Sequence, residues 1–318
     1  MNLNRSIFSL LLVAIFIILN GCAPKNPLPF GKKYSSSSIN VPFVPPRSDL
    51  CGSTSIEMVS SYWQATTAYV PRLSLQELDE RTFIPAKSGT LQIELITAAR
   101  ADGFLVYLLE PTLEALIVEL AEHHPVIVLV NRSYSWYPLW HYAPVTGYDA
   151  NAETILTHFA NKPNEAVPIG TFSALWERSG NWGIVLLPPG KLPASASPNK
   201  FLNSAYDLEK LGMVNEAIIS YKSALARWPE DIGLLFALGN SYYNIHQISD
   251  AEQIYRKIVS IDSTYPFALN NLADLLCHTN RSDEALKLLD QAVTDNIATQ
   301  SMIEATRKEI IAGCVPLN

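Results

Sequence analysis

The sequence predicts an α+β domain in the first two thirds of the chain and an all-α array of helical repeats in the last third. Between residues 39 and 190, helix-like patterns come first and strand-like patterns follow, which is typical of helices packed on an antiparallel sheet. After residue 199, residues of similar size recur with a step of 34, which indicates repeated helix pairs. A length of 318 residues accommodates one or two such domains and a targeting segment.

Apolar periodicity predicts the elements of the first domain. In the segment that begins at Cys51, Ile56, Val59 and Trp63 fall on one side of a helix. The expected helices are 51–63, 75–83, 91–101 and 112–122. The expected strands are 104–109, 126–130, 141–148, 154–159 and 184–187. Residues 191–198, KLPASASP, are expected to link this domain to the repeats.

The repeat pattern is carried by small residues that keep a spacing of 34. One series is Ala217, Ala251 and Ala285, and an earlier one is Ala205, Gly239 and Ala273. Small residues are expected where two helices cross closely. These residues resemble the tetratricopeptide consensus, which implies three repeats over 199–300 and a capping helix and tail over 301–318. Such an array implies a protein partner in its groove, and Asn240, Asn270 and Asn271 are candidate peptide-binding side chains or simply solvated ones.

The first 21 residues are interpreted as an export signal. Arg5 precedes an apolar stretch, residues 7–19, in which only Ser9 is polar, too short for a comfortable membrane span. The sequence Leu-Asn-Gly-Cys at residues 19–22 resembles the lipobox of bacterial lipoproteins, which implies lipidation of Cys22, a lipid-anchored tether over 22–38 and attachment to a membrane. Ala23 after this cysteine favours the outer membrane, facing the periplasm; the alternative is an ordinary signal peptide.

Charge and cysteine content exclude some classes of function. The net charge is −7 and no basic run is present, so no nucleic-acid partner is expected. The four cysteines lack metal-ligand spacing and are too sparse to predict a disulfide scaffold. Cys277 is therefore interpreted as a small buried residue, and Cys314 has no evident role. No metal or organic cofactor is expected.

Two segments carry the candidate chemistry. Cys51 stands at the start of a predicted helix and is followed by Gly52, and we expect the positive end of the helix dipole to lower the pKa of its thiol. His141 begins a predicted strand beside several aromatic residues. A thiol and an imidazole are the pair that cysteine nucleophiles use, although each residue alone could be an ordinary buried one.

The two segments together resemble the bacteriocin-leader-processing cysteine peptidases of the double-glycine type, which have a papain-like fold. The similarity runs over about residues 41–188 and is carried by Cys51-Gly52, His141-Tyr142 and Gly147-Tyr148-Asp149. It implies that Cys51 is the nucleophile, that His141 is the general base and acid, and that a peptide or protein is the substrate. It also implies a bacterial lipoprotein branch in which this domain is fused to tetratricopeptide repeats.

Two departures from that family bear on activity. The positions of the usual oxyanion-stabilising glutamine hold Pro45 and Pro46, which offer no donor, and Arg47 or Ser48 are candidate substitutes. The positions of the usual orienting aspartate hold Thr157 and His158, which become the candidate third residues. Asp149 is interpreted as a turn residue.

Three functions are therefore compatible with the sequence. The first is a membrane-anchored cysteine peptidase that hydrolyses peptide bonds through Cys51 and His141, with the repeats as a docking module. The second is a weakly active or inactive lipoprotein that binds peptides or assists assembly. The third is a cell-wall amide hydrolase with the same dyad, because the fold does not fix the scissile bond.

Overall fold

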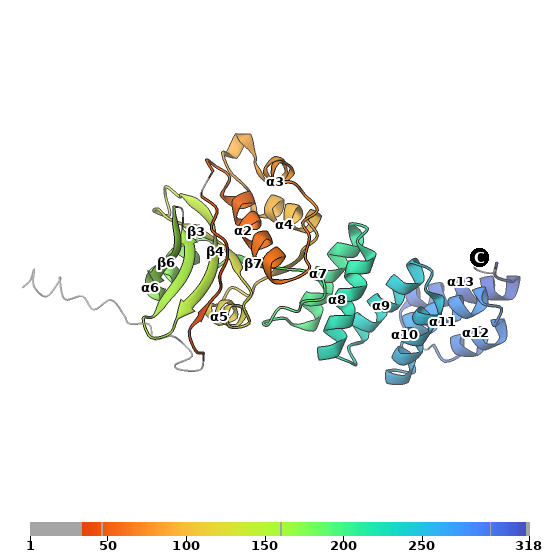
Figure 1. The fold of residues 1–318 in the computed structure, drawn as a ribbon. Helices are drawn as coiled ribbons and strands as arrows, with labels where there is room; N and C mark the ends of the chain where they lie inside the picture. The colour runs from red at the N-terminus through yellow and green to blue at the C-terminus, as the bar shows by residue number, and fades with distance from the viewer. Residues whose placement is uncertain (1–33, 46, 160, 293, 316–318) are drawn as a thin grey trace, which may run out of the picture.

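The computed structural model describes residues 34–315 except 46, 160 and 293. The predicted signal peptide, the lipidation site Cys22 and most of the tether lie outside the described residues. None of the helices in the described part of the chain is long and apolar enough to span a membrane. The described chain forms an α+β domain, and a helical arm extends away from it (Figure 1), so the predicted fold class is confirmed.

The α+β domain is built on an antiparallel seven-stranded sheet. Its strand order is β2-β7-β3-β4-β5-β6, and β1 pairs with β4 beyond the end of β3. The strands are β1 (Ser37–Ser38), β2 (Leu105–Leu108), β3 (Val126–Asn131), β4 (Trp140–Asp149), β5 (Thr154–Phe159), β6 (Lys162–Pro168) and β7 (Gly183–Leu187). The register of β3 and β4 sets His141 opposite Val130.

The helices of this domain lie on and around the sheet. They are α2 (Cys51–Thr66), α3 (Leu75–Thr82), α4 (Gln92–Ala101), α5 (Leu113–Ala121) and α6 (Ile169–Glu177), with a short 3-10 helix at Pro85–Lys87. Helix α2 packs on β4, and its buried face includes the predicted Ile56, Val59 and Trp63. The Trp63 indole N–H donates to the Leu186 carbonyl oxygen at 2.8 Å, which fixes the helix against β7.

Local sequence signals explain where several helices begin. Ser74 caps α3 by accepting from the Glu77 N–H, and the Glu77 carboxylate in turn accepts from the Ser74 N–H. Thr112 caps α5 in the same way through the Ala115 N–H. By contrast, α2 begins without a side-chain cap, so its first N–H groups remain available at Cys51.

The helical arm consists of three packed helix pairs and a last helix. The pairs are α7 (Pro198–Lys210) with α8 (Val214–Arg227), α9 (Ile232–Asn244) with α10 (Ile248–Ile261), and α11 (Pro266–His278) with α12 (Ser282–Leu289), and α13 (Ile297–Ala312) follows. The predicted close crossings are confirmed by the space around Gly239, where an added Cβ would lie 2.6 Å from a ring carbon of Tyr255.

The segment expected to be a linker is hydrogen-bonded to the α+β domain. The buried Glu119 carboxylate accepts from the Ser195 N–H at 2.8 Å and from its hydroxyl at 2.6 Å, and the Ala194 N–H donates to the same side chain. His124 Nδ1 contacts the second carboxylate oxygen, Oε2, at 2.7 Å. The segment therefore joins the two parts by specific contacts.

Ion pairs outside this segment also join the two parts of the chain. They connect Lys200 to Glu110, Arg72 to Glu216 and Arg100 to Asp207.

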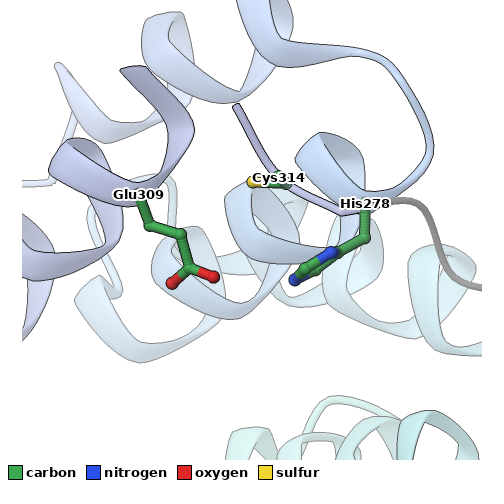
Figure 2. A group of neighbouring side chains, drawn as sticks. All are labelled: His278, Glu309 and Cys314. Carbon is green, nitrogen blue, oxygen red and sulfur yellow. The ribbon is translucent and has the colours of Figure 1, made fainter. Parts of the chain in front are cut away.

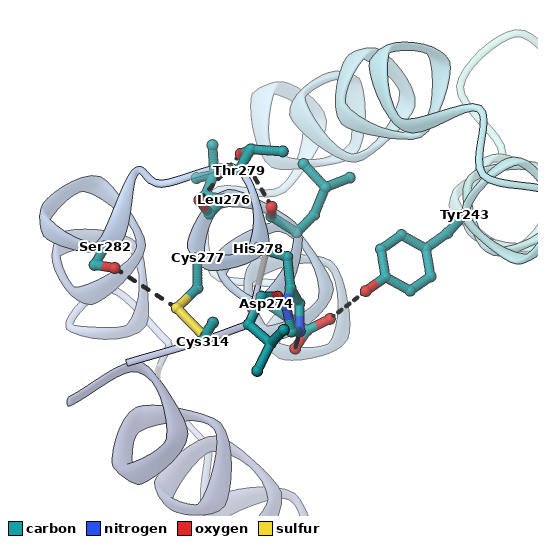
Figure 3. Close-up of a disulfide and its surroundings, with 10 residues drawn as sticks. Tyr243, Asp274, Leu276, Cys277, His278, Thr279, Ser282 and Cys314 are labelled. Carbon is teal, nitrogen blue, oxygen red and sulfur yellow. Dashed lines mark hydrogen bonds and ion pairs between the residues drawn. A yellow bond between two sulfur atoms is a disulfide. The ribbon is translucent and has the colours of Figure 1, made fainter. Parts of the chain in front are cut away.

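A disulfide corrects the interpretation of two cysteines. Cys277 on α11 is bonded to Cys314, which lies two residues after the end of α13 (Figure 3), with the two Cα atoms 5.7 Å apart. Cys277 is buried, as expected, but it is also disulfide-bonded, and Cys314, for which the sequence indicated no role, is its partner. The two cysteines are 37 residues apart, so the sequence alone did not predict that they pair. The packing of α13 against α11 brings them together.

Candidate active site

Cys51 lies at the beginning of α2 with backbone N–H groups directed at its sulfur. Donors come from Cys51 itself, from Gly52 and from Tyr142 on β4. Tyr142 directly follows His141 in the chain, so the backbone next to the predicted general base contacts the thiol. The fold thus brings together the two segments that are 90 residues apart in the sequence, as the numbering of Cys51 and His141 shows.

The thiol is neutral in the resting site. Burial raises the pKa of Cys51, and this effect exceeds the opposite effect of the three backbone N–H groups, while Asp49 raises the pKa further. The N–H groups of Cys51 and Gly52 at the helix N-terminus do lower the pKa of the thiol, as expected, but burial outweighs them, so the net shift is upward.

The imidazole of His141 is also neutral. Burial, and then the charge of Arg132, lower the pKa of His141 to about 4. The ring stacks on Phe159 of β5, with ring centroids 6.1 Å apart and planes 16° apart. The Arg132 guanidinium lies over the same Phe159 ring, 5.5 Å from its centroid. At pH 7 such a histidine carries a proton in only about one molecule in a thousand.

Phe159 contacts His141 where an orienting polar side chain was expected. The two candidates on the same strand are engaged elsewhere. The Thr157 hydroxyl donates to the Pro144 carbonyl oxygen at 2.8 Å. His158 contacts the Val41 carbonyl oxygen through Nε2 at 2.9 Å, and its Nδ1 accepts from the Asn164 N–H. These contacts tie β5 to neighbouring chain segments, and they give the side chains structural roles.

The candidate substitutes for the oxyanion donor also have other partners. Arg47 pairs with Asp79 at 2.5 Å and with Glu57 at 3.1 Å, and it donates to the Thr54 hydroxyl. The Ser48 hydroxyl donates to Asp49 at 3.3 Å. Pro45 lacks a donor, and Pro46 lies outside the described residues. The N–H groups of Cys51 and Gly52 are therefore the oxyanion donors that this geometry offers.

Asp149 is confirmed as a turn residue. Its carboxylate accepts from the N–H groups of Asn151 and Ala152 at 2.8 and 3.0 Å, which lowers the pKa of Asp149. Gly147 in the same motif allows β1 to approach closely, because a Cβ added at this position would overlap with the Ser37 carbonyl oxygen. The Gly-Tyr-Asp part of the motif therefore has a structural role.

A group of side chains in the helical arm brings three metal-ligating residue types together. Ligand atoms of His278, Glu309 and Cys314 lie within 4.8 Å of one another (Figure 2). The Cys314 sulfur is bonded to Cys277, so it offers no thiolate, and His278 Nδ1 contacts the Val315 carbonyl oxygen at 2.6 Å. Two remaining ligand atoms are too few for a structural zinc site, and we assign none here.

Comparison with known proteins identifies the first domain. Residues 38–184 match the model of the Peptidase_C39 like family. The chain contains a Peptidase_C39-like domain. A tetratricopeptide repeat model matches residues 254–287, so repeats follow this Peptidase_C39-like domain.

Curated relatives match parts of the chain. Cellulose synthase operon protein C of Pseudomonas fluorescens (strain SBW25) is 28% identical over 152 residues, which are 44% of this chain and 12% of that protein. The uncharacterized protein ycf37 of Porphyra purpurea is 29% identical over 103 residues, 31% of this chain and 58% of that protein. The chain thus spans 12% of the length of the first relative and 58% of the length of the second.

Solved structures of repeat proteins are also similar to part of the chain. The TPR2B domain of yeast Sti1, in its complex with pHsp70, shares 16% identity, with 34% of this chain and 90% of that chain covered and a TM-score of 0.32. The Yersinia enterocolitica type III secretion chaperone SycD, in complex with a peptide of the translocator YopD, shares 15% identity, with coverages of 36% and 92% and a TM-score of 0.34.

Proposed function

We propose that this protein is a lipid-anchored cysteine peptidase that cleaves peptide bonds through Cys51 and His141. The observation that carries the proposal is the position of the Cys51 thiol at the start of α2, beside the backbone of the Tyr142 that follows His141. The match of residues 38–184 to the Peptidase_C39 like family supports it.

The neutral state of both groups constrains the chemistry. A neutral imidazole can accept a proton, so His141 would take the Cys51 proton as the sulfur attacks the peptide carbonyl carbon. The developing oxyanion would be stabilised by the N–H groups of Cys51 and Gly52. His141 would then protonate the leaving amine, and water would hydrolyse the thioester. No metal or organic cofactor enters these steps.

The repeats are proposed to dock a peptide or protein partner. A hollow of about 520 Å³ runs along α7 and α9 and is lined by Tyr206, Phe236 and Asn240 among others. Asn240 is partly engaged, since its side-chain oxygen accepts from the Tyr255 hydroxyl and from Asn271. Asn270 is buried, and its side-chain oxygen has no partner. The hollow therefore offers a partner the rings of Tyr206 and Phe236 beside an asparagine that is already partly engaged.

Export, lipidation at Cys22 and attachment to the outer membrane are part of the same proposal and rest on the sequence. Labelling cells with a fatty-acid analogue, for the wild type and for Cys22→Ala, tests them. Incorporation that is lost in the variant supports the anchor, and equal incorporation would contradict it.

A second function, peptide binding without efficient hydrolysis, is favoured by one observation: Phe159 stacks on His141 where a polar orienting group was expected. The two functions are separated with the chain that begins at Ala23. The wild type, Cys51→Ala and His141→Ala are incubated with a mixed peptide library, and cleavage is followed by mass spectrometry. Cleavage that both variants abolish supports the peptidase; cleavage by none of the three, with peptides retained on the protein, supports the binding function.

A further inference from the structure

Two buried polar atoms on one short segment have no hydrogen-bond partner. They are Oγ1 of Thr90 and Oε2 of Glu94. Glu94 lies in the first turn of α4, which begins at Gln92, and Thr90 directly precedes the residue at the helix N-cap. A buried polar atom without a partner costs about 1–3 kcal/mol, more for a charged group, so two neighbouring ones point to a place that a ligand completes.

This segment borders the proposed catalytic residues. An added Cβ at Gly52 would lie 2.6 Å from Thr90 Oγ1, so the Thr90 side chain packs directly on the backbone beside Cys51. On the other side, the Tyr142 phenol is close enough to Cys51 and Glu94 for both charges to raise its pKa, after the larger effect of burial. Thr90 therefore borders the backbone beside Cys51, and Glu94 follows on the same segment near the Tyr142 phenol.

Among the described residues, no cation is hydrogen-bonded to Oε2 of Glu94 or to Oγ1 of Thr90. Arg47, the basic residue nearest to Cys51 in the sequence, pairs with Asp79 and Glu57, and Arg100 at the end of α4 pairs with Asp207. The first turn of α4, in which Glu94 lies, supplies no hydrogen-bond donor to its Oε2. A carboxylate oxygen accepts hydrogen bonds only, so the missing partner is a donor.

We infer that Glu94 and Thr90 form a subsite for a positively charged nitrogen of the substrate, next to the bond attacked by Cys51. The cation is either a lysine or arginine side chain or a free amino terminus. Leu91 and Ile93 on the same segment are 45% and 59% exposed, so the rim can cover the aliphatic stem of such a residue. The net charge of −7 also favours the approach of basic peptides. The inference rests on the proposed function for the place of the substrate.

Thiol-specific reagents of different charge test the subsite without requiring hydrolysis. The Cys51 thiolate attacks the sulfenyl sulfur of a methanethiosulfonate, a disulfide forms, the sulfur–sulfonyl bond breaks, and methanesulfinate leaves with the electron pair. The thiol proton goes to the buffer. In the chain that begins at Ala23, Cys51 is the free cysteine of the described residues, since Cys277 and Cys314 are paired.

The measured quantity is the ratio of Cys51 labelling rates with aminoethyl and methyl methanethiosulfonate. We expect this ratio to fall about tenfold in Glu94→Gln, because the neutral reagent corrects for any change in thiol pKa. The ratio should be largely kept in Glu94→Asp, which keeps the charge. It should fall by a smaller factor in Thr90→Val, which removes the uncharged acceptor of the subsite and keeps the charge. Glu177→Gln, on the exposed side of α6, removes one charge elsewhere and should change nothing. An unchanged ratio in Glu94→Gln, with its melting temperature preserved, overturns the subsite.

Whether the bound cation is a side-chain ammonium or a free amino terminus is found by measuring which small amine protects Cys51 from labelling. Nα-acetyl-lysine methylamide presents a side-chain ammonium, and glycine methylamide presents a terminal one. Slower labelling of Cys51 by the neutral reagent with either compound, lost in Glu94→Gln, supports the subsite and identifies the source; protection by neither contradicts it. Charge selectivity without peptide hydrolysis would overturn the peptidase proposal alone, and hydrolysis without charge selectivity would overturn the subsite alone.

Discussion

The His141 imidazole stacks on the Phe159 ring at a centroid distance of 6.1 Å, in the place where a polar neighbour would orient the ring. Phe159 is buried, so it removes water from the histidine and supplies no hydrogen bond. This contact, together with the nearby Arg132, accounts for a neutral His141 and for a resting site without an ion pair.

Iodoacetamide labelling of Cys51 should be slow at neutral pH and should rise only in the alkaline range. The reason is that burial raises the thiol pKa, so the reactive thiolate forms above the ordinary cysteine range of about 8.5. The rate is measured against pH for the chain that begins at Ala23, with Cys51→Ala as the blank. Fast labelling below pH 7 that His141→Ala abolishes would show a thiolate–imidazolium pair and refute this prediction.

Replacing Phe159 by Asp should raise the pKa of His141 from about 4 towards its ordinary value, by about 1–2 pH units, because a carboxylate beside the ring stabilises the imidazolium. The measurement is an NMR titration of the His141 ring protons. Phe159→Leu is the control, since it removes the aromatic ring without adding charge. A pKa that is equal in the two variants would mean that the introduced carboxylate does not reach the imidazole.

Arg132→Gln should also raise the pKa of His141, by a smaller amount. Removing a positive charge lowers the free-energy cost of protonating the imidazole, while burial, the larger cause, remains. The same NMR titration checks the direction of the change. Arg178→Gln is a suitable control, because Arg178 donates to the carbonyl oxygens of Asn131 and Ser133 in the same loop. An equal shift in both variants would point to loop rearrangement.

Breaking the Cys277–Cys314 disulfide should loosen α13 and destabilise the end of the repeat array by about 4 kcal/mol, from the entropy of a closed loop of this length. Hydrogen exchange of Cys314→Ser should show faster exchange in α13 and α11 and little change in the sheet. Cys277→Ser should behave alike, and the double variant should add nothing. Unchanged exchange in α13 would show that helix packing alone holds it.

Gly52→Ala should destabilise the α+β domain by about 1–3 kcal/mol, because the new Cβ would stand 2.6 Å from Thr90 Oγ1 and 2.9 Å from Thr90 Cβ. Thermal denaturation measures the loss. Thr90→Ala in the same chain should recover part of it, whereas Gly170→Ala, where an added Cβ meets nothing within 4 Å, serves as the unstrained control. Full stability of Gly52→Ala would contradict the close approach.

The sequence alone determined much of the fold. Apolar periodicity located the helices that became α2 to α5 and most strands of the sheet, because burial of one face leaves a regular trace in the sequence. It missed β6 and α6: β6 is rich in polar residues and mostly exposed, and α6 begins with Pro168 at its N-cap and no polar side-chain cap. The spacing of 34 residues predicted helix pairs because each pair repeats the same crossing.

Tertiary structure decided the properties of the site. The sequence placed Cys51 at a helix start and His141 on a strand, but the pKa values of both depend on burial and on Arg132, which only the packed sheet brings to the ring. The Cys277–Cys314 pair and the juxtaposition of Thr90 with Gly52 likewise join residues far apart in the chain. Local sequence determines the backbone conformation that a residue adopts. The burial of a titratable group and its side-chain partners depend on its neighbours in three dimensions.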